Sequence, residues 1–294
     1  MPYVWFVVVC SIWGSSFILM KRAMLCVSPI GIGAIRDACG ALVLAAIFLM
    51  ARRKSSLRRK DLIPLCGIAI LGFAWPHSIQ PELVSRVGGA FIGMTVGMTP
   101  LITILVSIPM LGVFPTPRQL FGVIGALICM AVLMQDEMRH SVALIDVLTA
   151  FSVPTTYSIA NSWIRRSLRH LPPLELTLLC LSMASSMLLP LMLIVPDRRT
   201  IDPGNWLIAI ASVATLGIAG TGFATYLFNK LVQDQGPLFA SMTTILVPVG
   251  AILWGWADGE QISSIQIAAL AGILVMVTIV QFGAVQPSPA KQDA

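Results

Sequence analysis

Long apolar runs separated by short polar stretches dominate the chain. A membrane-spanning helix needs about 20 mostly apolar residues, because each residue adds about 1.5 Å along the axis of a bilayer core about 30 Å thick. No water in that core can satisfy an open backbone, so such runs must be helical. The pattern predicts an all-α integral membrane protein with ten transmembrane helices, at residues 4–21, 29–51, 62–83, 88–112, 118–134, 142–163, 174–195, 205–229, 236–256 and 265–283.

The composition excludes an ordinary soluble protein. Of the 294 residues, 57% are hydrophobic and 11% are charged, and the mean hydropathy is +0.88. Soluble domains have about 45–50% apolar and about 25% charged residues. The net charge of +6 does not indicate nucleic-acid binding, because the basic residues form short clusters between apolar runs. The six cysteines form no CxxC pair, and we expect buried thiols and no metal site.

The basic residues also predict an orientation. Counted on alternate sides of the spans, 12 Lys and Arg lie on the side of the N-terminus and 6 on the other, with Arg36 inside a span. Cytoplasmic loops of membrane proteins carry the excess of basic residues. We therefore expect a multi-pass protein of the cell (inner or plasma) membrane with both termini cytoplasmic, ending in a disordered tail at 284–294.

An internal repeat divides the chain into residues 1–137 and 138–283. Four residues of the first part recur 148 positions later: Phe91, Met94, Thr95 and Pro100 correspond to Phe239, Met242, Thr243 and Pro248. Each part holds five predicted spans, and five is odd, so the second part enters the membrane from the opposite side. Two inverted five-helix repeats are a recurring architecture of secondary transporters, with the substrate site near the midplane between them.

These residues resemble a known family. The stretches WGSSFILMKRA (13–23) and IRDACGALVLAAIFLMARR (35–53) resemble the first spans of EamA-type members of the drug/metabolite transporter superfamily. Residues 237–277 resemble that family's last two spans, with Pro248, Gly259, Glu260, Gln266 and Gly272 as the marks. The resemblance covers about the whole chain. It departs at 112–114 (GVF), where the first repeat lacks the acidic turn residue that the second has as Glu260.

The resemblance implies two inverted EamA-like repeats around a cavity bordered by the first, third, fourth, sixth, eighth and ninth helices. It also implies transport of a small metabolite, often efflux of an amino acid or related compound. We expect a secondary transporter that works by alternating access and needs no cofactor. A lipid-linked carrier translocase, or another non-transport membrane protein of the same fold, is the alternative, because the fold could present a laterally open groove.

The predicted helix midpoints form a belt of Ser, Thr, Gly, Pro and aromatic residues. Such residues let helices approach closely or line a polar cavity, and for the belt as a whole we favour a cavity. The cavity candidates in the belt are Trp13, Ser16, Thr95, Thr155, Tyr157, Tyr226, Thr243 and Thr244. Pro100 and Pro248 are equivalent in the two repeats, and each kinks its helix, either as a gate hinge or as a static bend.

Charged and titratable residues inside spans need a specific explanation, because an unpaired cation at that depth costs at least a few kcal/mol. Arg36 either binds a substrate carboxylate or bonds helix-end carbonyls, and we favour the structural role because the family resemblance places its helix outside the cavity. Asp37 is a proton-site candidate or the partner of a basic residue at the outer surface. His77 and Gln80 are cavity candidates, although a backbone carbonyl would also satisfy His77.

Other functional classes lack their signatures. The three histidines form no HExxH motif, and the chain has no GxSxG or Walker A sequence, so we expect no enzyme and no catalytic residue. Thr95-Val96-Gly97 is similar to part of a potassium filter, but Met98 and Thr99 follow instead of Tyr-Gly. The expected partners are the lipid bilayer and a small-molecule substrate. Proton coupling and the choice between monomer and homodimer stay open.

Overall fold

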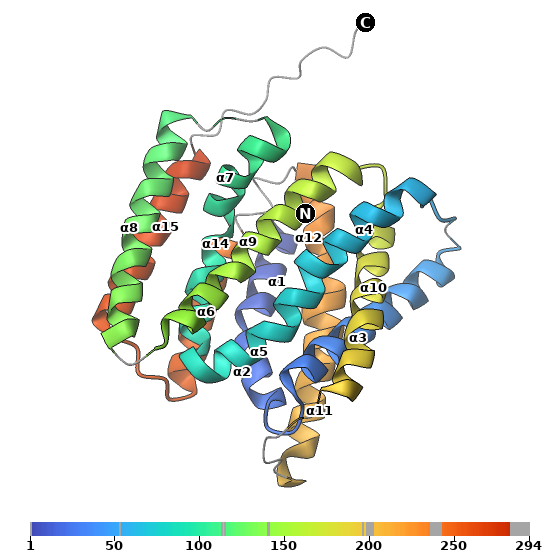
Figure 1. Ribbon diagram of the computed structural model, residues 1–294, viewed down its shortest axis with the longest axis horizontal. Coiled ribbons are helices and arrows are strands. Elements are labelled where there is room, and N and C mark those ends of the chain that lie inside the picture. Colours follow the sequence, from blue (N-terminus) through green and yellow to red (C-terminus); the bar gives the residue numbers. More distant parts are fainter. Residues whose placement is uncertain are drawn as a thin grey trace, which may run out of the picture.

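The computed structural model describes residues 2–52, 54–112, 114, 116–139, 142–195, 197, 203–235 and 243–282. Within these residues the regular secondary structure is helical, with no strand (Figure 1). The predicted tail at 284–294 and the first residues of the predicted span 236–256 lie outside the described residues.

The first part of the chain contains α1 (Pro2–Gly14), α2 (Ser16–Ala23), α3 (Pro29–Met50), η1 (Arg59–Asp61), α4 (Leu62–Ala69), η2 (Ile70–Ala74), α5 (Trp75–Val87), α6 (Gly89–Gly97), α7 (Thr99–Leu111) and α8 (Pro117–Arg139). The start of α3 shows how the sequence sets these bounds. The Ser28 hydroxyl accepts a hydrogen bond from the Gly31 N–H at 2.9 Å, and Pro29 occupies the first turn, where its missing N–H costs nothing.

The second part contains α9 (Leu144–Ser167), α10 (Pro173–Ile194), η3 (Pro203–Asn205), α11 (Trp206–Thr215), η4 (Leu216–Phe223), α12 (Ala224–Gln235), α14 (Thr243–Ala257) and α15 (Ser264–Phe282). Two elements have a form that hydropathy does not predict. Both η2 and η4 are π-helices, and each interrupts a longer helical rod, α4–η2–α5 and α11–η4–α12. Such segments often occur at functional sites, because they disturb the regular backbone bonding of the helix.

Helices occupy all ten predicted ranges, as far as these are described. Six are long and apolar enough to cross a membrane: Tyr3–Ala23, Pro29–Met50, Arg59–Val87, Gly89–Leu111, Pro173–Ile194 and Trp206–Leu231. Leu246–Ala257 and Ser264–Met276 are shorter apolar helices, and α9 carries many hydroxyl and amide side chains. The count of ten spans and the inverted relation of the halves stay predictions.

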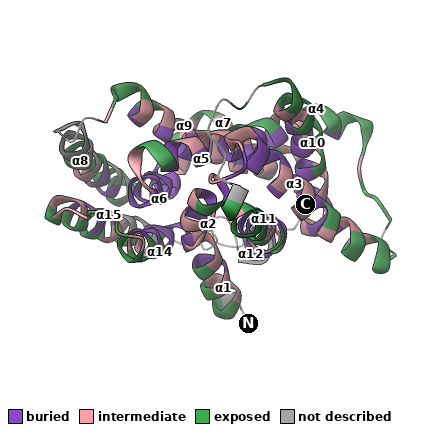
Figure 2. Ribbon diagram, turned by 90° about the horizontal axis from the view of Figure 1, so that it is seen from below, coloured by how far each residue is buried: buried purple, intermediate pink, exposed green. Residues whose placement is uncertain are grey.

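Helices far apart in sequence pack side by side. The most extensive contacts are those of α3 with α10, α6 with α14, and α8 with α15. The last pair lies at one edge of the molecule in both Figure 1 and Figure 2. Between α1 and α14 the backbones touch, since a Cβ added to Gly250 would lie 2.8 Å from the Cα of Gly14. A larger residue at either position would therefore push these two helices apart.

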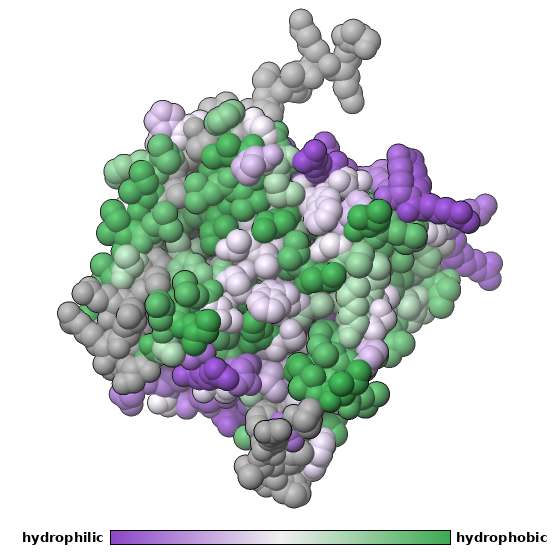
Figure 3. Space-filling model, viewed as in Figure 1, coloured by the Kyte–Doolittle hydropathy of each residue, from purple (hydrophilic) through white to green (hydrophobic). Residues whose placement is uncertain are grey.

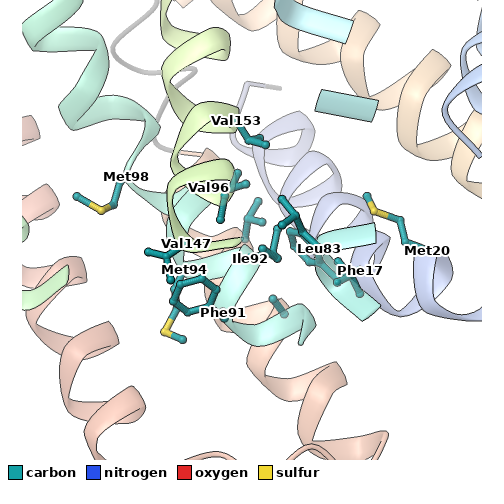
Figure 4. Close-up of a cluster of buried hydrophobic side chains, with 14 of the residues drawn as sticks. Phe17, Met20, Leu83, Phe91, Ile92, Met94, Val96, Met98, Val147 and Val153 are labelled. Carbon is teal, nitrogen blue, oxygen red and sulfur yellow. The ribbon is translucent and has the colours of Figure 1, made fainter. Parts of the chain in front are cut away.

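Two apolar clusters hold the bundle together. The larger includes Phe17, Leu83, Phe91 and Met94 and joins α2, α5 and α6 to α9 and α14 (Figure 4). The second joins α3, α4 and α10, with Leu44, Leu65, Ile68 and Leu181 among its buried members. The helices thus have small and apolar residues at their mutual contacts, as is typical of membrane bundles.

The outer surface is also apolar over large areas. Leu42, Leu49, Ile63, Leu193 and Leu207 are at least 70% exposed. Hydrophobic residues cover much of the face in Figure 3, and hydrophilic residues gather toward two opposite edges. Exposed apolar surface of this extent is costly in water and is matched by the acyl chains of a bilayer.

Candidate functional site

A cavity of about 120 Å³ lies among the helices of both halves. Its walls come from α1, α2, α3, η2 and α5 of the first half and from α9, η4, α12 and α14 of the second, with residues at the α6–α7 junction. Polar side chains interrupt an otherwise apolar lining: Ser16, Arg36, His77, Gln80, Thr99, Tyr157, Asn161, Thr225, Asn229 and Thr244.

Arg36 is the cation of this cavity. Arg36 is the eighth residue of α3 and is only 5% exposed. The Nε–H donates a hydrogen bond to the Thr221 hydroxyl of η4 at 2.8 Å. Nη1 has no hydrogen-bond partner among the described residues. A buried guanidinium with an unused donor is energetically costly, which marks it as a group that can bind a ligand.

Asp37 and His77 form a buried pair beside Arg36. The Asp37 Oδ1 lies 2.5 Å from the His77 Nδ1, and Asp37 is fully buried. Its Oδ2 has no partner within the described chain. The His77 ring stands edge-on to Phe73 with the centroids 5.7 Å apart. Tyr157 of α9 lies within electrostatic range of both Arg36 and Asp37 and, like Gln80, lines the cavity.

An aromatic wall faces this cluster. The Trp13 indole N–H donates to the Gly220 carbonyl of η4 at 3.0 Å, and the Trp13 ring is 5.1 Å from that of Phe228. A carbonyl oxygen has two lone pairs, so the Gly220 carbonyl can accept this side-chain bond from another helix. Trp13 thereby ties α1 to η4 at the cavity wall.

A second polar group lies toward the other end of the cavity. Asn229 of α12 is buried and donates to the Thr177 hydroxyl of α10 at 2.6 Å. Asn161, on the cavity-lining part of α9, adds a second amide. Neither asparagine was among the predicted cavity residues, and neither were Thr99 and Thr221. Their signal was an amide or hydroxyl inside an apolar run, but nothing in the sequence tells which helix such a group faces.

Comparison with known proteins decides the family. The chain matches the model of the EamA-like transporter family over residues 1–135 and 144–282. The chain belongs to that family. Uncharacterized transporter YoaV of Bacillus subtilis is 23% identical over 256 residues, which are 86% of this chain and 87% of that protein. The S-adenosylmethionine/S-adenosylhomocysteine transporter of Chlamydia trachomatis is 21% identical over 254 residues, 83% of this chain and 78% of that protein.

The fold is also shared with a protein of known crystal structure. It superposes with a TM-score of 0.69 at 20% identity, covering 96% of this chain and 97% of the other. Together with the apolar helices, the family assignment makes this EamA-like chain a multi-pass membrane transporter.

Most of the predicted cavity residues lie on the cavity wall of this EamA-like transporter: Trp13, Ser16, His77, Gln80, Tyr157 and Thr244. Four others lie away from it: Thr95, Thr155, Tyr226 and Thr243. Thr95 and Thr155 bond the carbonyls of Ile92 and Phe151 within their own helices, a common way for threonine to be satisfied. Tyr226 packs against the second apolar cluster, and Thr243 is fully buried.

The charged residues differ from what we expected. Arg36 lines the cavity, although its helix was expected to lie outside, and it bonds a threonine hydroxyl instead of helix-end carbonyls. Asp37 pairs with His77 and not with a basic residue at the surface. His77 bonds the Asp37 carboxylate, whereas a backbone carbonyl was one of the partners expected for it. These contacts join α3 to η4 and α5, and sequence spacing within one helix does not reveal them.

The two prolines are in different local settings. Pro100 lies in the first turn of α7, directly after the break between α6 and α7 at Met98. Pro248 lies inside α14, which continues through it. It also contacts α6, because a Cβ added to Gly97 would lie 2.6 Å from the Pro248 Cγ. The two kink sites thus meet where α6 crosses α14.

Charged groups close one end of the bundle, where α2 and α14 end and α6 begins. Lys21 and Arg22 both pair with Asp258, and Lys21 Nζ is 3.6 Å from the Glu260 Oε1. The Glu260 carboxylate also accepts the Gly89 N–H at 3.2 Å. We call this set, Lys21, Arg22, Asp258 and Glu260, the ionic closure. No group of three or more His, Cys, Asp or Glu that could hold a metal occurs among the described residues.

The Trp13 bond to η4 gives a first prediction. Trp13→Phe keeps a ring beside Phe228 but removes the N–H, leaving the Gly220 carbonyl without its donor. Loss of a partner for a buried polar group costs about 1–3 kcal/mol, so the thermal midpoint of the detergent-purified protein should fall. Trp206→Phe, at an exposed tryptophan, is the control and should change nothing. An equal midpoint for both variants would contradict the assignment.

Proposed function

We propose that the protein is a secondary transporter that moves a small metabolite, an amino acid or a related compound, out of the cell by alternating access. It acts in the inner or plasma membrane with both termini cytoplasmic. The relative named for S-adenosylmethionine and S-adenosylhomocysteine supports a small-metabolite substrate. The cavity volume of about 120 Å³ also supports a small ligand, because drug-sized ligands occupy pockets of about 300–1,000 Å³.

The observation that carries the proposal is the position of the cavity between the two proposed repeats, residues 1–137 and 138–283. The three helix pairs with the most extensive contacts, α3–α10, α6–α14 and α8–α15, each join elements with the same place in the two proposed repeats. Other contacts occur in matched sets: α1 packs on α14 as α7 packs on α9, and α3 packs on η4 as α10 packs on η2. Such packing supports an inverted repeat with a shared central site.

The π-helices support the same relation. The first residue of η2 is Ile70 and that of η4 is Leu216, close to the repeat offset of 148. Both segments lie in the middle of the third span of their repeat and both contribute to the cavity wall. Irregular backbone at membrane depth is tolerated where it lines a cavity.

Reconstituted liposomes test the proposal. Saturable uptake or counterflow should occur for at least one member of a panel of amino acids and related metabolites, measured with and without a pH gradient. Protein-free liposomes are the control. Absence of saturable flux across a broad panel would contradict the transporter proposal. Movement of a labelled lipid-linked sugar carrier instead would favour the carrier translocase.

The prolines give a second prediction, on the proposed hinges. Pro100→Ala and Pro248→Ala restore a backbone donor and straighten the helix. We expect each to slow the flux more than it lowers the yield of folded protein, measured as the monodisperse fraction in gel filtration. Pro190→Ala, inside α10 and away from the cavity lining, is the matched control. If yield and flux fall in proportion, the prolines are static bends.

The ionic closure gives a third prediction. In a cysteine-free background, Met20→Cys reports access to the cavity, because Met20 lines it and is 2% exposed. Asp258→Asn removes the partner of Lys21 and Arg22. Because half-exposed ion pairs contribute up to about 1 kcal/mol, its loss should raise the population that is open at this end. Labelling of the introduced cysteine by a membrane-impermeant maleimide should therefore be about two- to five-fold faster. Glu82→Gln is the control, since Glu82 pairs with Arg86 elsewhere. An unchanged rate would show that the closure does not gate this end.

A further inference from the structure

Arg36 has an unused hydrogen-bond donor in the wall of the cavity. The Nη1 of Arg36 has no hydrogen-bond partner among the described residues. Arg36 lines the cavity and is only 5% exposed. A guanidinium presents a planar fork of N–H donors that matches the two oxygens of a carboxylate. The Thr221 hydroxyl accepts from the Nε–H, which leaves the Nη1 donors of the fork without a partner among the described residues.

The charges around Arg36 balance before any ligand binds. Asp37 supplies one negative charge beside the positive charge of Arg36, and His77 bonds Asp37. Tyr157 from α9 is the remaining titratable group that interacts with both charges. With His77 neutral the set has no net charge, so a bound anion would leave one uncompensated negative charge in a buried site.

The other elements packed against α3 and α5 add no charge to this set. The segments η2, η4, α6 and α11 contain no titratable residue, and Cys39 and Cys180 are the thiols of α3 and α10. The remaining charged groups of the packed helices have partners outside this set or are exposed. Those with partners are Lys21 and Arg22 in the ionic closure, Arg86 with Glu82 and Asp146, and Glu175 with Ser55 and Ser56. Arg165, Arg166 and Lys230 are exposed.

We propose that the cavity binds the carboxylate of its substrate at Arg36 and that this binding is linked to uptake of one proton by the Asp37–His77 pair. The proposal rests on the proposed transport function and deepens it by naming the substrate's charged group. The proton comes from water and is added at an outer atom of the pair, Asp37 Oδ2 or His77 Nε2, because the inner Nδ1 and Oδ1 already share a hydrogen bond. By linkage, the carboxylate and the proton raise each other's affinity equally.

A carboxylate fits better than a phosphate. The lining contains one permanent cation and no lysine, so a doubly charged phosphate would lack compensation. The rest of the cavity wall is largely apolar and includes the aromatic rings of Phe17, Phe73 and Phe228. They suit a ligand with one charged group and an apolar remainder.

The experiment compares carboxylates with their amides. Hexanoate and benzoate, against hexanamide and benzamide, are titrated calorimetrically into the purified full-length protein. For the wild type the amides should bind at least about ten-fold more weakly, because they cannot form the charge-assisted bonds. Arg36→Gln should abolish this preference and Arg36→Lys should keep part of it. Arg86→Gln, at an exposed arginine outside the cavity, is the matched control.

Proton uptake is measured by repeating the titration in two buffers of different ionisation enthalpy. The wild type should take up about one proton per carboxylate bound, and His77→Gln or Asp37→Asn should reduce this number toward zero. His170→Gln is the control histidine, since His170 pairs with Asp61 at another site. Each variant is first checked for a monodisperse gel-filtration profile, and the wild-type comparisons need no variant at all.

Several results would overturn the inference. Equal affinity for carboxylates and amides, or no binding of either acid at millimolar concentration, would exclude the anion site. Carboxylate binding without proton uptake would exclude the linkage. Saturable liposome flux of a neutral metabolite, with no preference for carboxylates, would refute this inference and leave the transport function standing. Carboxylate binding with proton uptake but without flux of any substrate would support the anion site and refute the transport function.

Discussion

The burial of the Arg36 guanidinium is the constraint on which the centre of the molecule depends. Its bond to Thr221 requires α3 and η4 to lie in backbone contact, and glycines make this approach sterically feasible. A Cβ added to Gly217 would lie 2.7 Å from the Cys39 Cβ and 2.9 Å from the Arg36 carbonyl oxygen. The π-helical form of η4 and its glycines therefore let the Thr221 hydroxyl reach the guanidinium of Arg36. This contact matters because the hydrocarbon core of a bilayer offers no water to solvate a cation.

The two proposed repeats pack in a similar way but differ in chemistry. The pairs α3–α10 and α6–α14 join elements that the proposed repeat makes equivalent, yet α10 has no counterpart of Arg36 or Asp37. Chain positions place Arg36 and His77 toward the end with the ionic closure, and Asn161 and Asn229 toward the opposite end. A ligand in the cavity thus meets ionic groups on one side and amides on the other, and this polarity would orient it between the two openings.

Hydropathy predicts the helices well because a bilayer demands long apolar helical runs, and all ten predicted ranges contain helices as far as they are described. The sequence pattern also places Trp13 and Tyr157 near helix midpoints, and it marks Arg36, Asp37 and His77 as residues inside spans that need a specific explanation. It does not predict partners. The contacts of Arg36 with Thr221 and of Asp37 with His77 join residues 185 and 40 positions apart. Nor does it predict the π-helices, which arise from packing between helices and leave no hydropathy signal.

The ionic closure follows from a difference between the halves that the sequence already contains. Glu260, in the turn after α14, caps the start of α6 and pairs with Lys21, whereas the turn at 112–114, its counterpart in the proposed repeat, has no acid. Two identical inverted halves would give two conformations of equal free energy, one open to each side. A carboxylate at one turn only stabilises closure at one end only, so the proposed exchange between states is biased even without substrate. A ligand must then supply this free-energy difference by binding one state more tightly than the other. The Arg36 cluster, on the side of the cavity nearest the ionic closure, is placed to make that distinction.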